Sequence, residues 1–280
     1  MIIHLIDGTY ELFRHFYGLR RFHKTDPPFG AVSGVLNTVA KMIEDGATHL
    51  GVATDHIIES FRNELWPGYK TGAGIDHALR AQFIPLEEGL AAMGVAVWPM
   101  VEFEADDALA AAAHLAAKNK SVQKVCIWTP DKDLAQCVVG DRVVQIDRRK
   151  NEIRDEPAVR AKFGVPPEFI PDFLALVGDA ADGYPGIKGL GAKTAASLIN
   201  RFGPIEQFPP EILAARNREL AVLFKHLATL RTDAPLTSPT VGRSTRISDL
   251  EWKGPTALLA PLAEKFGDKR IASRVSKLVK

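Results

Sequence analysis

The segment KVCIWTPDKDL, residues 124–134, joins a short apolar run directly to a turn that carries two aspartates. The run 124–129 is rich in β-branched and aromatic residues and is typical of a buried strand. Asp131 and Asp133 follow at the point where this strand ends. The same order, a strand and then an acidic residue, recurs through the first half of the chain and indicates both the fold class and the site.

Strands and helices alternate over the first part of the chain. The predicted strands are 2–6, 49–54, 95–98, 124–129 and 142–146, and the helices between them are 31–44, 77–93 and 105–119. This alternation predicts a mostly parallel sheet covered by helices on both faces. From about residue 155 the strands stop, and helices are predicted over 156–163, 167–177, 191–202, 216–231 and 256–266. We therefore expect an α/β domain followed by a helical region.

Composition places the chain among ordinary globular proteins. It has 280 residues, of which 46% are hydrophobic and 25% charged, enough to bury a sizeable core. Cys126 and Cys137 have no metal-ligand spacing, so we expect reduced thiols. The apolar start 2–6 is too short for a signal peptide, and no run approaches the ~18 apolar residues of a membrane span. We expect a cytoplasmic protein with no membrane partner.

Charge is distributed unevenly along the chain. Residues 188–280 hold 16 Lys and Arg against 8 Asp and Glu, a net of +8, and residues 1–187 hold 19 against 26, a net of −7. This asymmetry favours an acidic centre beside a basic face, although chance asymmetry on solvated helices would give the same totals.

Acidic residues stand at the exits of four predicted strands. They are Asp7 after the first, Asp55 after the second, Glu104, Asp106 and Asp107 after the third, and Asp131 and Asp133 after the fourth. In a parallel sheet these exits share the carboxyl edge, where open α/β folds place their sites. Carboxylates gathered there raise one another's pKa unless cations neutralise them, and oxygen ligands suit Mg²⁺ or Mn²⁺.

Each acid also has a structural alternative. Asp106 or Asp107 could complement a helix N-terminus, Asp131 could cap a short helix, and Asp7 before Gly8 is an ordinary strand-to-turn signal. Because four exits carry acid together, the sequence favours a metal site at the sheet edge.

The segment GDAADGYPGIKGLGAKTA, residues 178–195, combines two more aspartates with a glycine-rich run. Asp179 and Asp182 could face the same acidic edge. The order GIKGLG differs from the dinucleotide fingerprint and lies between helices, which argues against a nucleotide cofactor. Glycine amides, the start of helix 191–202 and two lysines suit a nucleic-acid phosphate. The alternative is a tight turn between helices without a ligand.

An ordered set of segments resembles the 5′-nuclease superfamily, most closely the 5′–3′ exonuclease domain of bacterial DNA polymerase I and its free-standing relatives. The segments are LIDGTYELFR (5–14), GAVSGVLNTV (30–39), SFRNELWPGYK (60–70), LRAQFIPLEEGLAAMGV (79–95), FEADDALA (103–110), TPDKDLAQ (129–136), 164–195 and LATLRTD (227–233). The resemblance implies a PIN-like, Rossmann-like nuclease domain over 1–160 with a helical arch at about 61–93. It implies a helical region over 161–280 with a helix-hairpin-helix, or helix-3-turn-helix, element at about 164–202.

The resemblance also implies roles for matched residues. The metal cluster comprises Asp7, Asp55, Glu104, Asp106, Asp107, Asp131, Asp133, Asp179 and Asp182, of which Asp7, Asp106 and Asp131 also count as catalytic, and it holds two Mg²⁺ or Mn²⁺ ions. Lys70 faces the scissile phosphate from the arch, with Arg62 and Arg14 near it. Contacts to DNA come from Phe13, Lys70, Gly186, Lys188, Gly189, Gly191, Lys193 and Thr194, with K⁺ as a further ion at the loop. The family's usual arginine three residues after Lys70 is replaced by Ala73.

The function implied is structure-specific, metal-dependent hydrolysis of DNA at 5′ ends, flaps or nicks, as a 5′–3′ exonuclease and flap endonuclease in replication or repair. A monomer in the bacterial cytoplasm or nucleoid is expected, with a DNA polymerase acting in trans. Two alternatives stay open: a non-catalytic structure-specific DNA-binding protein on the same fold, and an RNA-cleaving PIN-type nuclease.

Overall fold

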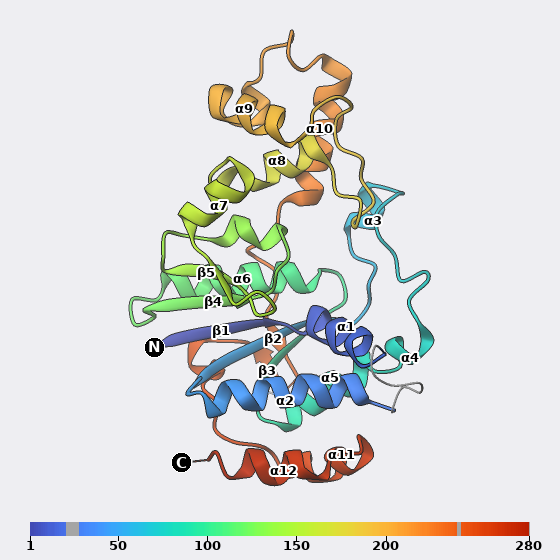
Figure 1. Ribbon diagram of the computed structural model, residues 1–280, viewed down its shortest axis with the longest axis vertical. Coiled ribbons are helices and arrows are strands. Elements are labelled where there is room, and N and C mark those ends of the chain that lie inside the picture. Colours follow the sequence, from blue (N-terminus) through green and yellow to red (C-terminus); the bar gives the residue numbers. More distant parts are fainter. Residues whose placement is uncertain (21–27, 240–241, 280) are drawn as a thin grey trace.

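The computed structural model describes residues 1–20, 28–239 and 242–279 and is built around a six-stranded sheet (Figure 1). The strands are β1 (Ile2–Asp7), β2 (His49–Asp55), β3 (Ala96–Met100), β4 (Lys124–Trp128), β5 (Val143–Asp147) and β6 (Glu152–Arg154). Their order is β3-β2-β1-β4-β5-β6, and all pairs are parallel except β5 with β6. The predicted mostly parallel sheet and its five strands are confirmed. The three-residue β6 was not predicted because so short a strand shows no periodicity.

Helices cover both faces of this sheet because alternate strand residues point to opposite sides. One face packs against α1 (Gly8–Leu19), α2 (Gly30–Glu44) and α5 (Phe83–Ala92), with α11 (Leu259–Lys265) and α12 (Lys269–Ser276) further out. The other face packs against α6 (Ala105–Lys118). Figure 1 shows α6 on one side of the sheet and α2, α11 and α12 on the opposite side. Ile6 belongs to the first core and Leu5 to the second.

A helical region with its own core follows the sheet. It contains α7 (Glu156–Phe163), α8 (Ile170–Val177), α9 (Ala192–Phe202) and α10 (Ala215–Ala228). Leu174, Ile199 and Phe224, from three of these helices, are buried together. The remaining elements are α3 (Arg62–Leu65), α4 (His77–Arg80), the 3₁₀ helices η1 (Asp133–Cys137), η2 (Pro167–Phe169), η3 (Ile205–Gln207) and η4 (Ile247–Leu250), and the hairpin β7 (Thr237–Ser238) and β8 (Arg243–Ser244). Among the described residues, no helix has both the length and the apolar character needed to cross a membrane.

The predicted helix 77–93 is wrong at its centre, where the structure has two helices, α4 and α5. The break falls at Gln82, whose buried side-chain oxygen accepts the backbone N–H groups of Ala31 and Val32 at 3.1 and 3.2 Å. These are free donors in the first turn of α2. Gln82 therefore serves the end of another helix, a role that periodicity along one segment cannot indicate. Helices α1 and α12 were also not predicted.

Arg62 ties the short helix α3 into the interior. Its guanidinium donates to both oxygens of Asp107 on α6 at 2.7 Å each, and to Glu104 at 3.2 Å. It also donates to the backbone carbonyls of Leu227 and Thr229 at the end of α10. Arg62 is 1% exposed and Asp107 is fully buried. Both charges are thus removed from water, and each depends on the other for neutralisation.

We predict that Arg62→Met lowers the free energy of unfolding by about 3–5 kcal/mol, because it leaves Asp107 buried without its partner. Urea unfolding followed by circular dichroism measures this. The matched control is Arg160→Met, which removes an exposed pair with Glu156 on α7 and should cost about 0.5 kcal/mol or less. Equal small losses in both variants would contradict the interpretation of this pair as a structural tie.

Candidate metal and nucleic-acid site

The acids at the strand exits lie at one edge of the sheet, as expected for parallel strands. Asp7 ends β1 and caps α1 by accepting the N–H of Tyr10 at 2.8 Å. Its other oxygen accepts the hydroxyl of Thr129 at 2.9 Å, just beyond β4. Asp55 ends β2 and accepts the N–H of Ala105 at 2.8 Å, at the start of α6. Hydrogen bonds between neighbouring strand exits thus hold the edge together.

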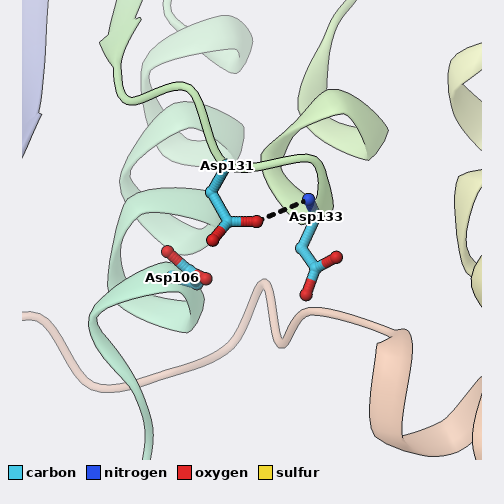
Figure 2. A group of neighbouring side chains, drawn as sticks. All are labelled: Asp106, Asp131 and Asp133. Carbon is cyan, nitrogen blue, oxygen red and sulfur yellow. Dashed lines mark hydrogen bonds between the residues drawn. The ribbon is translucent and has the colours of Figure 1, made fainter. Parts of the chain in front are cut away.

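Two acidic groups share Asp133. The first acidic group consists of Asp106, Asp131 and Asp133, and the second of Asp133, Asp179 and Asp182. Within each group the carboxylate oxygens lie within 4.8 Å of one another. Figure 2 shows the first group, with Asp106 on α6 facing the turn that carries Asp131 and Asp133. Asp131 accepts the N–H of Asp133 at 3.0 Å, so the turn itself orients both side chains. The sequence expectation that the loop after α8 reaches this edge agrees with the second group.

Among the described residues, no basic side chain forms an ion pair with the first acidic group. Burial and the charge of Asp131 raise the pKa of Asp106 and of Asp133 well above the usual range. Burial also raises the pKa of Asp7 to about 7, with contributions from Asp55 and Asp131. One oxygen of Asp133, Oδ1, is buried and has no hydrogen-bond partner. Such a group is costly unless a cation or a proton neutralises it.

Two lysines supply charge to the second acidic group. Lys70 Nζ lies 2.6 Å from Glu104 Oε2 and 3.0 Å from Asp182 Oδ1. Lys132 Nζ lies 2.6 Å from Asp179 Oδ2. The sequence predicts a role for Lys70 but assigns none to Lys132. The position of Lys132 between two acids, in the order Asp-Lys-Asp, is the one sequence signal that points to it.

The backbone around Lys70 is fastened to the loop that carries Asp182. The N–H of Lys70 donates to the carbonyl of Asp182 at 3.0 Å, and the indole N–H of Trp66 donates to the carbonyl of Gly183 at 3.0 Å. Gly183 has a φ of +81°, and a Cβ there would lie 2.0 Å from the carbonyl oxygen of Gly68. Only glycine permits this approach. The expected arch residue Lys70 is therefore positioned by the same loop that carries two of the acids.

Asp107 and Arg62 are placed differently from the expectation. Asp107 lies outside both acidic groups, and its oxygens accept from Arg62 and from the backbone N–H groups of Glu104 and Arg231 at 3.0 and 2.9 Å. The structural alternative, complementing the start of a helix, fits Asp107, which forms a capping box with Glu104. Adjacent residues on a helix point about 100° apart, so Asp106 reaches the edge while Asp107 turns inward. Arg62, paired with it, does not face the open side of the site.

The glycine-rich loop before α9 is exposed. Lys188, Gly189, Gly191, Lys193 and Thr194 are all open to solvent, whereas Gly186 is buried. Ile187, which is 5% exposed, anchors the loop in the core of the helical region. No side chain caps the start of α9 at Gly191. The loop therefore presents free amide groups and two lysines on one exposed surface.

Phe13 and Arg14 lie on α1 beside the edge. Phe13 is half-buried and packs against Phe83, with 6.1 Å between ring centroids. The Arg14 guanidinium is bound to the buried carboxylate of Glu11, with Nε 3.1 Å from Oε2. Asp7, Asp55 and Glu104 line the edge without joining either acidic group.

Comparison with known proteins agrees with this arrangement. Residues 2–164 match the family model of the 5′–3′ exonuclease N-terminal resolvase-like domain, and residues 165–251 match that of the 5′–3′ exonuclease C-terminal SAM fold. The chain is 36% identical over 253 residues to DNA polymerase I of Rhizobium leguminosarum. This alignment covers 83% of this chain but only 25% of the polymerase. It is 32% identical to a 5′–3′ exonuclease of Buchnera aphidicola, covering 82% of this chain and 81% of that protein.

A solved structure shows the same fold. The bacteriophage T5 flap endonuclease, crystallised with DNA and metal ions, superposes with a TM-score of 0.62 at 21% identity, covering 98% of this chain and all of that one. The chain thus spans a quarter of the polymerase relative and most of the free-standing exonuclease. With both family models matched in order over 2–251, the chain belongs to the 5′–3′ exonuclease family.

Proposed function

We propose that this chain is a metal-dependent, structure-specific 5′ nuclease that hydrolyses DNA phosphodiester bonds as a 5′–3′ exonuclease and flap endonuclease. One observation carries the proposal: two acidic groups sharing Asp133 lie at the carboxyl edge of the sheet, and the loop that supplies Asp179 and Asp182 continues into an exposed glycine–lysine run. One segment would thereby supply both metal ligands and contacts to the DNA backbone. Family membership supports the same activity.

The residues present fit divalent metal ions. Both acidic groups offer carboxylate oxygens alone, which suit Mg²⁺ or Mn²⁺. The unpartnered oxygen of Asp133 and the raised pKa values of Asp106 and Asp133 mean that a bound cation would be stabilised here. We assign Asp106, Asp131, Asp133, Asp179 and Asp182 as the ligands. When bound, two such ions would supply the charge that activates a water and stabilises a leaving oxygen.

The chain's own residues complete the site. Lys70, with a side chain 31% exposed, lies at the open side and would offset negative charge on the phosphate. Arg14 adds positive charge from α1, and Phe13 offers a ring on which a terminal base can stack. We propose that Arg62 and Asp107 stabilise the fold and contact neither metal nor DNA, because they neutralise each other inside the protein. Asp7 and Asp55 would position the metal ligands through their hydrogen bonds to neighbouring segments at the edge of the sheet.

The glycine-rich loop would hold duplex DNA. The exposed amides of Gly189 and Gly191, the uncapped start of α9 and the side chains of Lys188 and Lys193 form a surface suited to backbone phosphates. Thr194 is exposed on the same surface, whereas the buried Gly186 would shape the turn beneath it, and K⁺ is the further ion proposed there. Contacts of this kind position DNA without reading its sequence.

Further parts of the proposal concern organisation and partners. We propose a nuclease domain over 1–160 with a strand-guiding arch at about 61–93 and a DNA-holding region over 161–280, a division supported by the separate core of the helical region. A monomer acting beside a DNA polymerase in the bacterial cytoplasm or nucleoid fits this activity.

We predict that Asp131→Asn reduces cleavage of a 5′-flap DNA by about a hundredfold or more, because it weakens ion binding in the first acidic group. The control is Asp45→Asn, the same chemical change at a side chain that is 60% exposed and paired with Lys41, and it should cleave like wild type. Product formation is measured with Mg²⁺ and with a chelator.

Three results would contradict the proposal or favour an alternative. Unchanged cleavage by Asp131→Asn, or cleavage that survives chelation, would reject the metal-dependent mechanism. Flap binding without turnover in saturating Mg²⁺ would favour the non-catalytic DNA-binding protein. Preferential cutting of an RNA flap in competition with DNA would favour the RNA-cleaving alternative.

We predict that the Mg²⁺-dependent rise in Tm grows between pH 5 and pH 8. In the unfolded chain carboxylates titrate near pH 4, whereas burial raises the pKa of folded Asp7 to about 7 and also raises that of Asp106 and Asp133. The folded metal-free protein therefore binds extra protons in this window, and raising the pH removes them and lowers stability. Bound ions replace those protons.

Thermal unfolding at both pH values, in chelator and in Mg²⁺, provides the measurement. Burial lowers the pKa values of His4 and His15, but these histidines contribute equally in chelator and in Mg²⁺. The difference in Tm between the two conditions therefore reports on the acidic edge. A Mg²⁺-dependent rise that shrinks with increasing pH would contradict the charge balance described above.

We predict that Lys188→Ala with Lys193→Ala weakens binding of duplex DNA and makes it less dependent on salt. Each lost phosphate contact reduces the slope of log K against log salt by about 0.9, so the double variant should lose close to two. Fluorescence anisotropy in Ca²⁺ measures binding. Lys253→Ala, at a side chain 77% exposed, is the control, and an unchanged slope in the double variant would exclude this loop from the interface.

A further inference from the structure

Lys132 connects the two turns that form the second acidic group. It lies between Asp131 and Asp133 just after β4, and its ammonium crosses to Asp179 Oδ2 at 2.6 Å, in the loop after α8. The other oxygen of Asp179, Oδ1, accepts the N–H of Ala181 at 3.0 Å. Asp179 is 4% exposed. Both of its oxygens are therefore already engaged by the protein, one by the backbone and one by the lysine.

This arrangement distinguishes the two acidic groups. Among the ion pairs of the described residues, none joins a basic side chain to Asp106, Asp131 or Asp133, whereas Asp179 is paired with Lys132 and Asp182 with Lys70. An ion entering the second group would meet an ammonium already at Asp179 Oδ2. Two cations on one oxygen repel each other strongly when both are partly shielded from water.

Lys132 is held by its ion pair but is not enclosed. Its ammonium lies 2.6 Å from Asp179 Oδ2, and its side chain is 36% exposed. The lysine can therefore leave Asp179 for solvent without rearrangement of the buried core.

We propose that Lys132 is an internal counter-ion that occupies Asp179 in the metal-free protein and competes with the ion bound by the second acidic group, thereby setting that ion's affinity. This inference rests on the proposed function, because it assumes that the second group binds a divalent ion. Lys70 sits similarly at Asp182, but it also contacts Glu104 and is assigned to the phosphate. Lys132 is therefore the residue through which the competition can be tested separately.

The test measures Mn²⁺ binding without DNA, by isothermal titration calorimetry and by electron paramagnetic resonance of free Mn²⁺. The second ion here is the one bound by the second acidic group, and the first ion is the one bound by the first group. In Lys132→Met the Kd of the second ion should fall by about tenfold or more, because the competing unit charge at Asp179 is removed. The Kd of the first ion should change much less. The metal-free variant should also show a lower Tm, which Mn²⁺ restores.

Two matched variants separate the charge of Lys132 from the loss of its side chain. Lys132→Arg keeps the charge and should bind the second ion much as wild type does. Lys118→Met removes the same charge at the exposed far end of α6 and should leave both ions unaffected. If Lys132→Met does not fold in the metal-free state, Lys132→Gln, which can still donate a hydrogen bond to Asp179, serves in its place.

The outcomes separate this inference from the proposed function. A second ion that appears or tightens in the neutral variants supports the competition. An unchanged or weaker second ion, in protein that binds the first ion normally, overturns it and leaves the proposed nuclease intact. Failure of wild type to bind any Mn²⁺ would overturn both.

Discussion

Repulsion among carboxylates at one edge of the sheet is the constraint on which the rest of the structure depends. A parallel sheet brings its strand exits together, and here each of the central exits delivers acid. The protein opposes this repulsion in three ways. Arg62 neutralises Asp107 in the interior, Lys70 and Lys132 pair with Asp182 and Asp179, and Asp106 and Asp133 keep raised pKa values. Each of these reduces the cost of gathering carboxylates at one edge.

The same constraint explains why the segment before Lys70 is held so firmly. Arg62 fastens it to α6 and to the end of α10, and Trp66 and Lys70 fasten it to the loop after Asp182. The sheet, the helical region and the lysine at the open side are thereby joined at one place. The loop that carries Asp182 therefore packs directly on the backbone beside Lys70, where Gly183 meets Gly68.

Most of the site could be predicted because strand ends are visible in sequence. Asp7, Asp131 and Asp133 follow apolar runs, and a parallel sheet places such residues together. The helix break at Gln82, the inward turn of Asp107 and the pairing of Lys132 could not be predicted in this way. Each depends on a partner far away in the chain: α2 for Gln82, Arg62 for Asp107 and the loop after α8 for Lys132.

By itself, then, the sequence determined the α/β order, the acidic edge and the glycine–lysine loop, because these depend on local periodicity and on spacing along the chain. The nuclease family came from the resemblance of an ordered set of segments. Only the tertiary structure decided which acids share an oxygen-lined group and which are paired inside. Asp106 and Asp107 are neighbours of identical chemistry, yet one faces the edge and the other is buried. The physical reason is that a carboxylate's role follows from the charges packed around it, and packing brings together residues that sequence keeps apart.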